Sequence, residues 1–266
     1  MKVKTLLLLF FLSFSIFSCN FDDDEIAEDN EDFVYVGAAT FSFSDTYVFE
    51  KNKSYSVSAM YVCDHEVTQA EFFAIMGENP SKFIGGKLPV ESLNWYKTLV
   101  YCNKRSIAYG LSPCYKIGGS TNPNDWGEIP TSYNQKWNNV SCDFNANGYR
   151  LPTQLEWEYL ARGGTKESFR YSGSDDVNEV AWYEENSGIM THEVKTKKKN
   201  GLGLYDMSGN VWEWCFDCHK KYTRNRAKRG GAYNWERASC LLSLDGSNSP
   251  EVAADCVGFR VVRSAK

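Results

Sequence analysis

The sequence lacks the charge, the repeats and the motifs of several protein classes. Its 29 basic and 34 acidic side chains give a formal net charge of −5, which excludes the broad positive field of a nonspecific nucleic-acid binder. There is no fixed-period repeat, no glycine-rich phosphate loop, no zinc-ligand spacing and no Ser/His/Asp grouping above chance. Only three histidines are present, far apart at positions 65, 192 and 219. We therefore expect no nucleic-acid partner and no histidine-built iron site.

The N-terminus has the layout of a bacterial secretion signal. Two lysines precede an apolar run over residues 6–17, and the small Ser18 stands directly before Cys19. The run is too short for a stable membrane span. Residues 16–19 resemble a relaxed lipobox, which implies that Cys19 is lipidated and becomes the new N-terminus, although Phe17 is bulkier than the stricter form allows. The alternative is an ordinary cleaved signal that ends near a cysteine.

An acidic tether follows the leader. Residues 22–32 hold eight carboxylates and few hydrophobic side chains, so residues 20–32 are expected to link an anchor to a folded domain. The product would be lipid-anchored in a bacterial cell envelope, at the outer membrane and exposed on the surface. Residues 33–266 keep a net charge of about +1, since −5 − 2 + 8 = +1 after the two leader lysines and the eight carboxylates are removed.

Residues 33–266 predict one α+β domain with few helices. The composition, 42% hydrophobic and 24% charged, is enough for a full core. Strand-like segments occupy residues 33–43 and 47–60. Helices are expected after the capping box of Thr68 with Glu71, over residues 95–105, and after the capping box of Thr153 with Glu156.

Aromatic side chains are expected to hold this domain together. Residues 106–148 are rich in Gly, Pro, Asn and Ser and predict a long ordered loop, tied down by Trp126, Trp137 and Phe144. The rest of the scaffold, up to residue 228, should pack its large aromatics into a rigid base. The members of this base are Trp95, Trp157, Trp212, Trp214 and Tyr159.

Four segments together resemble one family. They are DHEVTQAEF at 64–72, the run from YRLPT through EWEY to ARGG at 149–164, GLYDMSGNVWEW at 203–214, and RGG at 229–231 closed by GFR at 258–260. Their order and spacing are similar to those of the formylglycine-generating-enzyme, or sulfatase-modifying-factor, family. The resemblance implies a C-type-lectin-like fold with little regular secondary structure. A fold does not establish an activity, so the site is considered separately.

The family enzyme is implied to hold copper(I) between two cysteines that follow Arg-Gly-Gly. Here the second position is Cys240, but the first is Trp235, whose indole cannot ligate the metal. We therefore expect no catalysis and no required cofactor. Two alternatives stay open: a copper-dependent oxidase with a rearranged ligand set, and a purely structural envelope lipoprotein.

Residues 229–260 carry a second resemblance, to the variable segment of proteins diversified by retroelements, and the whole chain is most like the treponemal variable lipoproteins of that class. Cys240 and Pro250 match fixed positions, and the positions between the ends imply a ligand-binding site. The candidate ligand-binding residues are Tyr233, Asn234, Trp235, Glu236, Ala238, Ser239, Leu244, Asp245, Gly246, Ser247, Asn248, Ser249, Glu251, Val252, Ala254, Asp255 and Cys256.

The chemistry of that segment also favours a surface site. Residues 244–256 show neither helix nor strand periodicity, which is typical of an exposed loop on a rigid scaffold, although a solvated connection is the alternative. Tyr233 and Trp235 would be the anchors. The acidic side chains would favour basic or hydroxyl-rich ligands, either proteins or glycans. These acids are Glu236, Asp245, Glu251 and Asp255.

Two further features concern metals and thiols. The family resemblance implies a structural calcium site; the alternative pairs Glu213 with a buried arginine such as Arg150. Its ligands would be the side chains of Asp206 and Glu213 and the carbonyls of Gly209 and Val211. An oxidising envelope would permit a Cys114–Cys142 or a Cys215–Cys218 disulfide.

Overall fold

The computed structural model describes residues 32–165 and 167–265. The leader, Cys19 and nearly all of the acidic tether lie outside the described residues. From Asp32 onward the chain forms one compact unit. Within the described ranges there is no helix with the length and apolar character needed to cross a bilayer.

One four-stranded antiparallel sheet joins the two ends of this unit. Its strand order is β1-β4-β12-β7. The strands are β1 (Phe33–Val36), β4 (Met60–Cys63), β12 (Val262–Ser264) and β7 (Tyr149–Arg150). The final strand, β12, therefore lies between two strands from much earlier in the chain.

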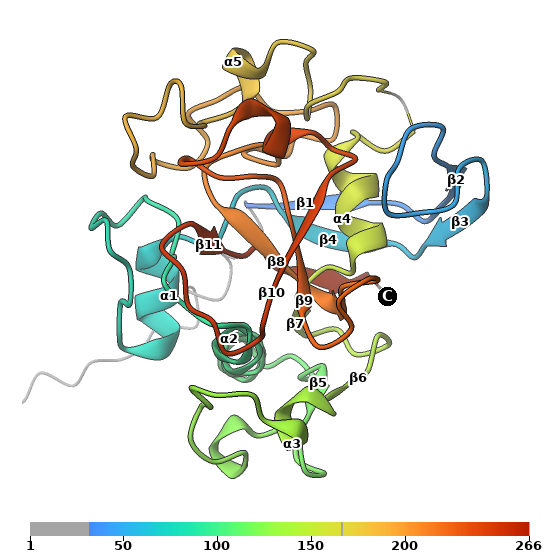
Figure 1. Ribbon diagram of the computed structural model, residues 1–266. Coiled ribbons are helices and arrows are strands. Elements are labelled where there is room, and N and C mark those ends of the chain that lie inside the picture. Colours follow the sequence, from blue (N-terminus) through green and yellow to red (C-terminus); the bar gives the residue numbers. More distant parts are fainter. Residues whose placement is uncertain (1–31, 166, 266) are drawn as a thin grey trace, which may run out of the picture. The chain divides into compact units, whose positions relative to one another are not determined.

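A second four-stranded sheet, in the order β10-β9-β8-β11, carries the C-terminal segment (Figure 1). Its strands are β8 (Trp212–Cys218), β9 (Arg226–Arg229), β10 (Asp245–Asn248) and β11 (Val257–Gly258). The β8–β9 and β9–β10 pairs are antiparallel, whereas β11 runs parallel to β8. Two small hairpin-like pairs complete the strands: β2 (Ala39–Ser42) with β3 (Ser54–Val57), and β5 (Tyr115–Lys116) with β6 (Ser141–Cys142).

The three expected helices are confirmed, and both capping boxes form. Thr68 caps α1 (Gln69–Met76), and Thr153 caps α4 (Gln154–Ala161). Asn94 caps α2 (Trp95–Ala108), which runs three residues past its predicted end. Short elements that the sequence did not predict are α3 (Gln135–Asn138), α5 (Val177–Val180), η2 (Pro123–Asp125) and η3 (Arg237–Cys240). Helices this short cannot display a helical period, which explains why they were missed.

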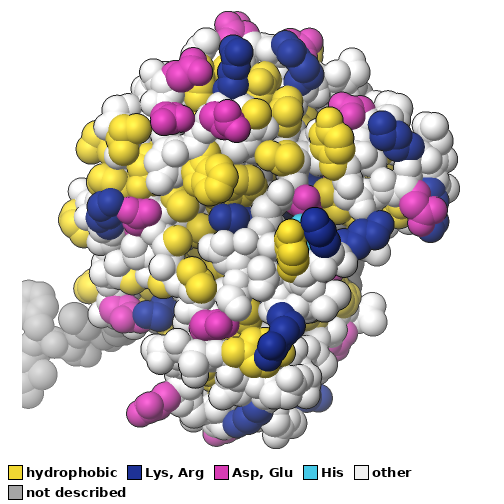
Figure 2. Space-filling model, viewed as in Figure 1, with side chains coloured by type: hydrophobic (Ala, Val, Ile, Leu, Met, Phe, Trp, Pro, Cys, Tyr) yellow, Lys and Arg dark blue, Asp and Glu magenta, His cyan; other side chains and the backbone are white. Residues whose placement is uncertain are grey.

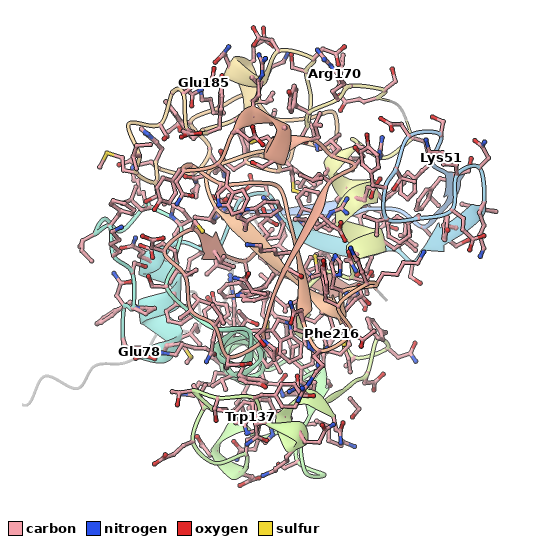
Figure 3. The ribbon with its side chains drawn as sticks, in the orientation of Figure 1. Lys51, Glu78, Trp137, Arg170, Glu185 and Phe216 are labelled. Carbon is pink, nitrogen blue, oxygen red and sulfur yellow. The ribbon has the colours of Figure 1, made fainter. Side chains whose placement is uncertain are left out.

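The expected aromatic base is confirmed, since Trp95, Trp157, Trp212, Trp214 and Tyr159 are all buried. Trp126 and Trp137 also tie down the long 106–148 segment, with their rings edge to face at 5.6 Å. Phe144 also ties the segment down, since its ring packs edge to face on Phe216 at 5.9 Å and covers the Arg150 guanidinium at 5.0 Å, although it stays 44% exposed. Trp137 and Phe216 lie toward the α3 end of the domain, and Arg170 and Glu185 toward the α5 end (Figure 3).

The eight cysteines from Cys63 to Cys256 are free thiols in the structure. Cys215 is buried inside β8 while Cys218 is exposed at its end, so the expected Cys215–Cys218 bridge does not form. Cys114 and Cys142 lie side by side, joined by a thiol hydrogen bond.

Candidate ligand-binding face

A buried ion pair fixes the start of the C-terminal segment. Arg229 ends β9 and is fully buried, with one guanidinium nitrogen 2.6 Å from a Glu158 carboxylate oxygen and 2.7 Å from the Leu242 carbonyl oxygen. Glu158 comes from α4, so the helix and the sheet are locked together at this point. A buried charge of this kind is tolerated only when it is paired and hydrogen-bonded.

Two glycines turn the chain directly after this pair. Gly230 and Gly231 have φ values of +98° and +81°, a region that side-chain-bearing residues rarely adopt. A Cβ on Gly231 would also lie 2.8 Å from the Ser239 carbonyl oxygen, and one on Gly230 would lie 3.2 Å from the Trp157 ring. The chain can therefore fold back on itself only because both positions are glycine.

A second buried ion pair fixes the end of the segment. The Arg260 guanidinium donates to both oxygens of Glu213 at 2.7 to 3.0 Å, and also to the carbonyls of Cys63 and Tyr205. Just before it, a Cβ on Gly258 would lie 2.5 Å from the Val90 carbonyl oxygen. Each end of the segment is thus held in the same way, by a buried, ion-paired arginine close to glycines that have no room for a side chain.

Between these ends, the backbone is hydrogen-bonded to the scaffold. The Ser187 hydroxyl donates to the Tyr233 carbonyl at 2.7 Å, and the Trp95 amide donates to the Pro250 carbonyl at 3.0 Å. Residues 245–248 form β10, so the expectation of an irregular loop throughout 244–256 is wrong there. These residues form a strand because β9 presents a free edge to pair with, a cause that the local sequence does not contain.

We define the outer face as the exposed and partly exposed side chains of residues 234–255 (Figure 2). Trp235 is 45% exposed, and Glu236, Arg237, Ala238, Val252 and Ala253 are exposed as well. The partly exposed members are Asn234, Leu241, Leu244, Asp245, Gly246, Ser247, Asn248, Ser249, Glu251, Ala254 and Asp255. Trp235 stands edge to face against Trp212, with ring centres 5.8 Å apart, and is the large aromatic that this face offers to solvent.

Three candidate residues lie beneath the outer face. Tyr233 is only 1% exposed and packs edge to face on Phe83 at 5.3 Å, so its expected exposure as an anchor is wrong. Ser239, also expected on the surface, is buried and donates to the Glu236 carbonyl oxygen at 2.7 Å. Cys256 is buried at the edge of the aromatic core. Tyr233 is buried because the glycine turn directs it inward, which its residue type alone does not reveal.

Comparison with known proteins agrees with this arrangement of motifs. A family model described as "Sulfatase-modifying factor enzyme 1-like domain" matches residues 21–265. The chain belongs to this family. The solved structure titled "Treponema denticola variable protein 1" is similar with a TM-score of 0.80 and 35% identity, over 88% of this chain and 95% of that one. The recognised resemblance and the C-type-lectin-like fold class are thereby confirmed.

Other relatives extend the comparison. The "Chaperone protein LppX" of Paenibacillus barcinonensis is 38% identical over 258 residues, which is 88% of this chain and 90% of that protein. The structure titled "Crystal Structure of CarF" has a TM-score of 0.72 and 26% identity, over 88% of this chain and 98% of that one. The formylglycine-generating enzyme of Streptomyces coelicolor is 30% identical over 161 residues, 48% of this chain and 51% of the enzyme. The match to the named enzyme therefore spans only about half of each protein.

The copper position of the sulfatase-modifying factor family is altered in this chain. Cys240 is buried in a cluster with Tyr171 and Val180, and burial raises the pKa of its thiol to about 12. Trp235 instead packs on Trp212. Among the described residues, the clusters with metal-ligand spacing are Cys63–His65–Glu71 and Asp32–Asp64–His65, and neither includes Cys240. The residues present at this position therefore do not fit a copper(I) centre.

The predicted calcium residues surround a buried arginine. Glu213 pairs with Arg260, whereas Arg150, the alternative partner, pairs with Glu156 at 2.7 Å. Asp206 accepts a hydrogen bond from the Lys195 amide at 2.8 Å, and burial raises its pKa to about 6. A third buried carboxylate, Glu66, lies close by, and its pKa is raised by burial and by the negative charges of Asp206 and Glu213.

Three carboxylates around one guanidinium leave negative charge that the protein itself does not neutralise. Asp206, Glu66 and Glu213 offer hard oxygen donors, the type that calcium prefers. These oxygens already accept hydrogen bonds from the protein, Glu213 from Arg260 and the Trp157 indole, and Glu66 from the Asn210 amide and the Val211 N–H. The three carboxylates are also not among the clusters with metal-ligand spacing in the described residues, so their arrangement does not fit a preformed calcium site. Calcium binding stays a prediction and is tested below.

The acidic side chains of the outer face are partly neutralised. Asp245 lies 3.0 Å from the His219 imidazole, and Asp255 lies 2.5 Å from the Lys82 ammonium. Glu236 is exposed and Glu251 partly exposed. Any preference for basic ligands therefore depends mainly on Glu236 and Glu251.

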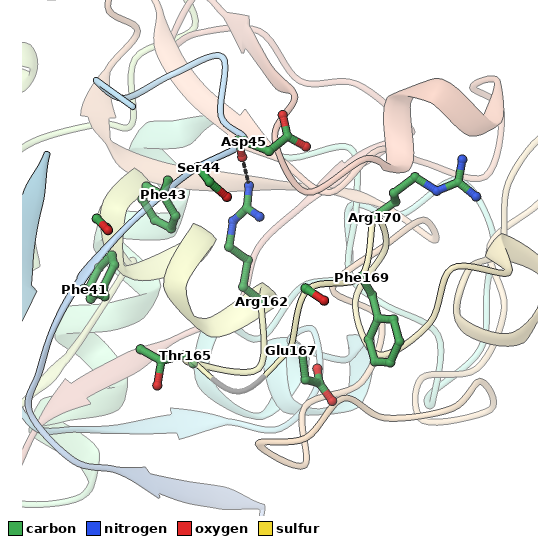
Figure 4. A pocket seen from close by; sticks show the side chains of 12 residues that line it. Phe41, Phe43, Ser44, Asp45, Arg162, Thr165, Glu167, Phe169 and Arg170 are labelled. Atoms are coloured by element: carbon green, nitrogen blue, oxygen red, sulfur yellow. Dashed lines mark hydrogen bonds between the residues drawn. The ribbon is translucent and has the colours of Figure 1, made fainter. Parts of the chain in front are cut away.

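A separate pocket of about 340 Å³ lies between the β2–β3 pair and the turn after α4 (Figure 4). Arg162 crosses it, but its guanidinium already donates to the Asp45 carbonyl and to Glu158. The pocket thus contains a cation that the protein uses internally, and it is a weaker site than the outer face.

Proposed function

We propose that this chain is a surface-displayed lipoprotein that binds a ligand through its outer face, and that residues 229–260 are diversified by a retroelement. The ends of this segment are anchored by Arg229 and Arg260, whereas the exposed side chains between them make few contacts with the scaffold. The observation that carries the proposal is Trp235, a large aromatic left 45% exposed on a well-packed base.

The proposed ligand is a protein or a glycan outside the cell. Surface loops on a rigid scaffold are where binding residues collect, and exposed tryptophans commonly dominate binding energy. The relative from Paenibacillus barcinonensis is named a chaperone, a class of proteins that bind polypeptides, so polypeptides belong in the screen beside glycans.

Capture from host surface components tests the proposal. The full-length protein is compared with a copy that carries other residues at the exposed positions 235, 236, 238 and 252. A control copy changes an equal number of exposed residues in β2 and in the connection between β2 and β3, including Thr40 and Lys51. We expect the first copy to lose or change its ligand and the control to keep it. Equal capture by all three would remove the segment as the specificity determinant, and no capture by any would favour a structural lipoprotein.

We also propose that the protein is not an oxidase, because the pair of thiolates needed for copper(I) is missing. The purified full chain should neither bind copper(I) tightly nor convert the cysteine of a sulfatase-type peptide to formylglycine. Turnover in this assay would establish the alternative enzyme with a rearranged ligand set.

The lipid anchor is proposed from the leader sequence. Cells that express the protein should incorporate a palmitate analogue into it, and Cys19→Ala should abolish both the label and membrane attachment. A Cys19→Ala protein that remained anchored would contradict the assignment. Digestion of intact cells by added protease should remove the domain if it is displayed on the surface.

A further inference from the structure

Lys228 is a buried ammonium group directly below the outer face. It lies on β9, one residue before the proposed diversified segment, and is only 5% exposed. Its Nζ atom is 4.8 Å from the centre of the Trp212 ring and 5.5 Å from the centre of the exposed Trp235 ring. The two indoles stand perpendicular to each other, so they form two walls around the charge.

No anion of the protein neutralises this charge. Among the described residues, Lys228 has no carboxylate partner and no hydrogen-bond acceptor, and the thiol of Cys256 is the titratable group that acts on it. Burial lowers the pKa of Lys228. Cation–π contacts with the two rings offset only part of the free-energy cost of burying a charge that has no anionic partner. The neighbouring basic residues differ, since Arg229 and Lys82 each have a carboxylate partner.

Gly246 on β10 makes room for the lysine. A Cβ at this position would lie 2.9 Å from Lys228 Cε and 3.4 Å from the Trp212 ring. Gly246 does not have a positive φ, so glycine is needed here because there is no room for a side chain and not because of the backbone conformation. Any larger residue at 246 would displace the Lys228 side chain from the two rings.

We propose that Lys228, Trp212 and Trp235 form a subsite for a carboxylate group attached to an apolar or ring-shaped part of the ligand, an inference that rests on the proposed ligand-binding function. The carboxylate supplies the charge that Lys228 lacks, and the exposed face of Trp235 packs on the attached ring. A single ammonium matches a single negative charge. Glu236 and Glu251 belong to the same outer face, and their negative charges would disfavour dianions such as phosphate monoesters.

The test uses benzoate as the probe and benzamide as its uncharged match. Binding to the full-length protein in detergent is followed by ligand-observed NMR and by titration calorimetry. We expect benzoate to bind at least tenfold more tightly than benzamide, and Lys228→Met to lose at least tenfold of the benzoate affinity. Gly246→Ser should weaken benzoate in the same way. Lys82→Met removes an equal charge that already has a partner, and it should leave benzoate binding unchanged.

Stability separates this role from a structural one. Because Met keeps the length of the side chain and removes an uncompensated charge, Lys228→Met should keep or raise the melting temperature. A lower melting temperature with benzoate binding intact would overturn the proposal, as would equal binding of benzoate and benzamide.

Two matched pairs of larger probes then identify the source of the carboxylate. One pair is a peptide with a free or an amidated C-terminus, and the other is an oligosaccharide that ends in glucuronate or in glucose. Preference for the charged member in either pair supports the subsite, and no preference in both overturns it. Lys228 lies outside residues 229–260, so the failures are distinguishable: an ineffective Lys228→Met change refutes the subsite alone, whereas an ineffective segment exchange refutes the proposed function.

Discussion

Individual side chains in the C-terminal segment divide into those that hold the fold and those that are free to bind. Arg229, Arg260 and Tyr233 are buried and paired or packed, whereas Trp235 and Glu236 extend into solvent. The two arginines mark the ends of the segment in the sequence motifs, but their burial and their partners Glu158 and Glu213 could not be predicted from the sequence. The inward position of Tyr233 could not, because it follows from the geometry of the glycine turn and not from the chemistry of tyrosine.

Loss of the Arg260 guanidinium should destabilise the whole domain. Arg260→Met leaves the buried Glu213 carboxylate without its partner, so the free energy of unfolding should fall by about 3–5 kcal/mol. Urea denaturation measures the change, with Arg237→Met as the exposed control, which should stay within about 0.5 kcal/mol of the wild type. A loss below about 1 kcal/mol would show that the pair does not hold the end of the segment.

Truncation of Tyr233 and of Trp235, two residues apart, should affect stability and ligand binding to different degrees. Tyr233→Ala empties a buried site and should cost about 3–5 kcal/mol of stability. Trp235→Ala should cost about 1 kcal/mol, because half of its ring already faces water, but it should lose about 2 kcal/mol or more of ligand binding. Thermal unfolding and a binding assay with any captured ligand measure the two effects. Similar stability losses for both variants would contradict the exposed position of Trp235.

Asp206 provides a pH test with a defined sign. Its pKa is raised in the folded state to about 6 from 3.8, so the folded protein holds the proton longer than the unfolded chain does. The free energy of unfolding should therefore decrease as the pH rises from about 4 to about 6. Asp206→Asn should flatten this slope and, without calcium, be more stable at pH 7.5 by about 3 kcal/mol. Asparagine tolerates the φ of +57° found here.

Calcium completes the Asp206 experiment. If the cation supplies the missing charge, it should raise the melting temperature of the wild type above pH 6 and have less effect on Asp206→Asn. An unchanged melting temperature with calcium or with a chelator would argue that protons alone compensate the three carboxylates.

At the scale of elements, the sequence predicted what local chemistry determines. Thr68 with Glu71 and Thr153 with Glu156 locate α1 and α4 because capping is a contact within four residues. β10 was missed because its sequence, Asp-Gly-Ser-Asn, has little strand propensity. It is a strand because β9 lies beside it. The candidate site follows the same rule: its boundaries were visible in the sequence, whereas the burial of Lys228 beneath Trp212 and Trp235 depends on tertiary packing and could not be predicted.

The β5–β6 pair should accept a disulfide. Cys114 and Cys142 already share a hydrogen bond, and their oxidation would close a loop of roughly 30 residues, worth about 3 kcal/mol by loop-closure entropy. Protein exported through an oxidising compartment should show this linkage in nonreducing peptide mapping and melt higher than Cys114→Ala. Two alkylated thiols at these positions in freshly isolated protein would contradict the prediction.

At the scale of the whole molecule, the β1-β4-β12-β7 sheet is complete only when β12, the last strand in the sequence, is present. β12 lies between β4 and β7 and is formed by the final residues of the chain. A chain that ends after residue 260 lacks this central strand, so it should not fold cooperatively, whereas removal of Ala265 and Lys266 alone should be tolerated. Circular dichroism during thermal unfolding distinguishes them, and cooperative melting of the shorter chain would refute the requirement for β12.

β12 follows the proposed ligand-binding segment 229–260 in the sequence, so its formation depends on that segment being translated in frame. A frameshift or a premature stop anywhere in that segment also deletes or scrambles residues 262–264, so the faulty product has no strand to place between β4 and β7. Such chains would lack the strand that pairs with both β4 and β7 and should not fold, whereas in-frame substitutions on the outer face leave these pairings intact. A correctly folded domain therefore requires that the reading frame be kept through residues 229–260.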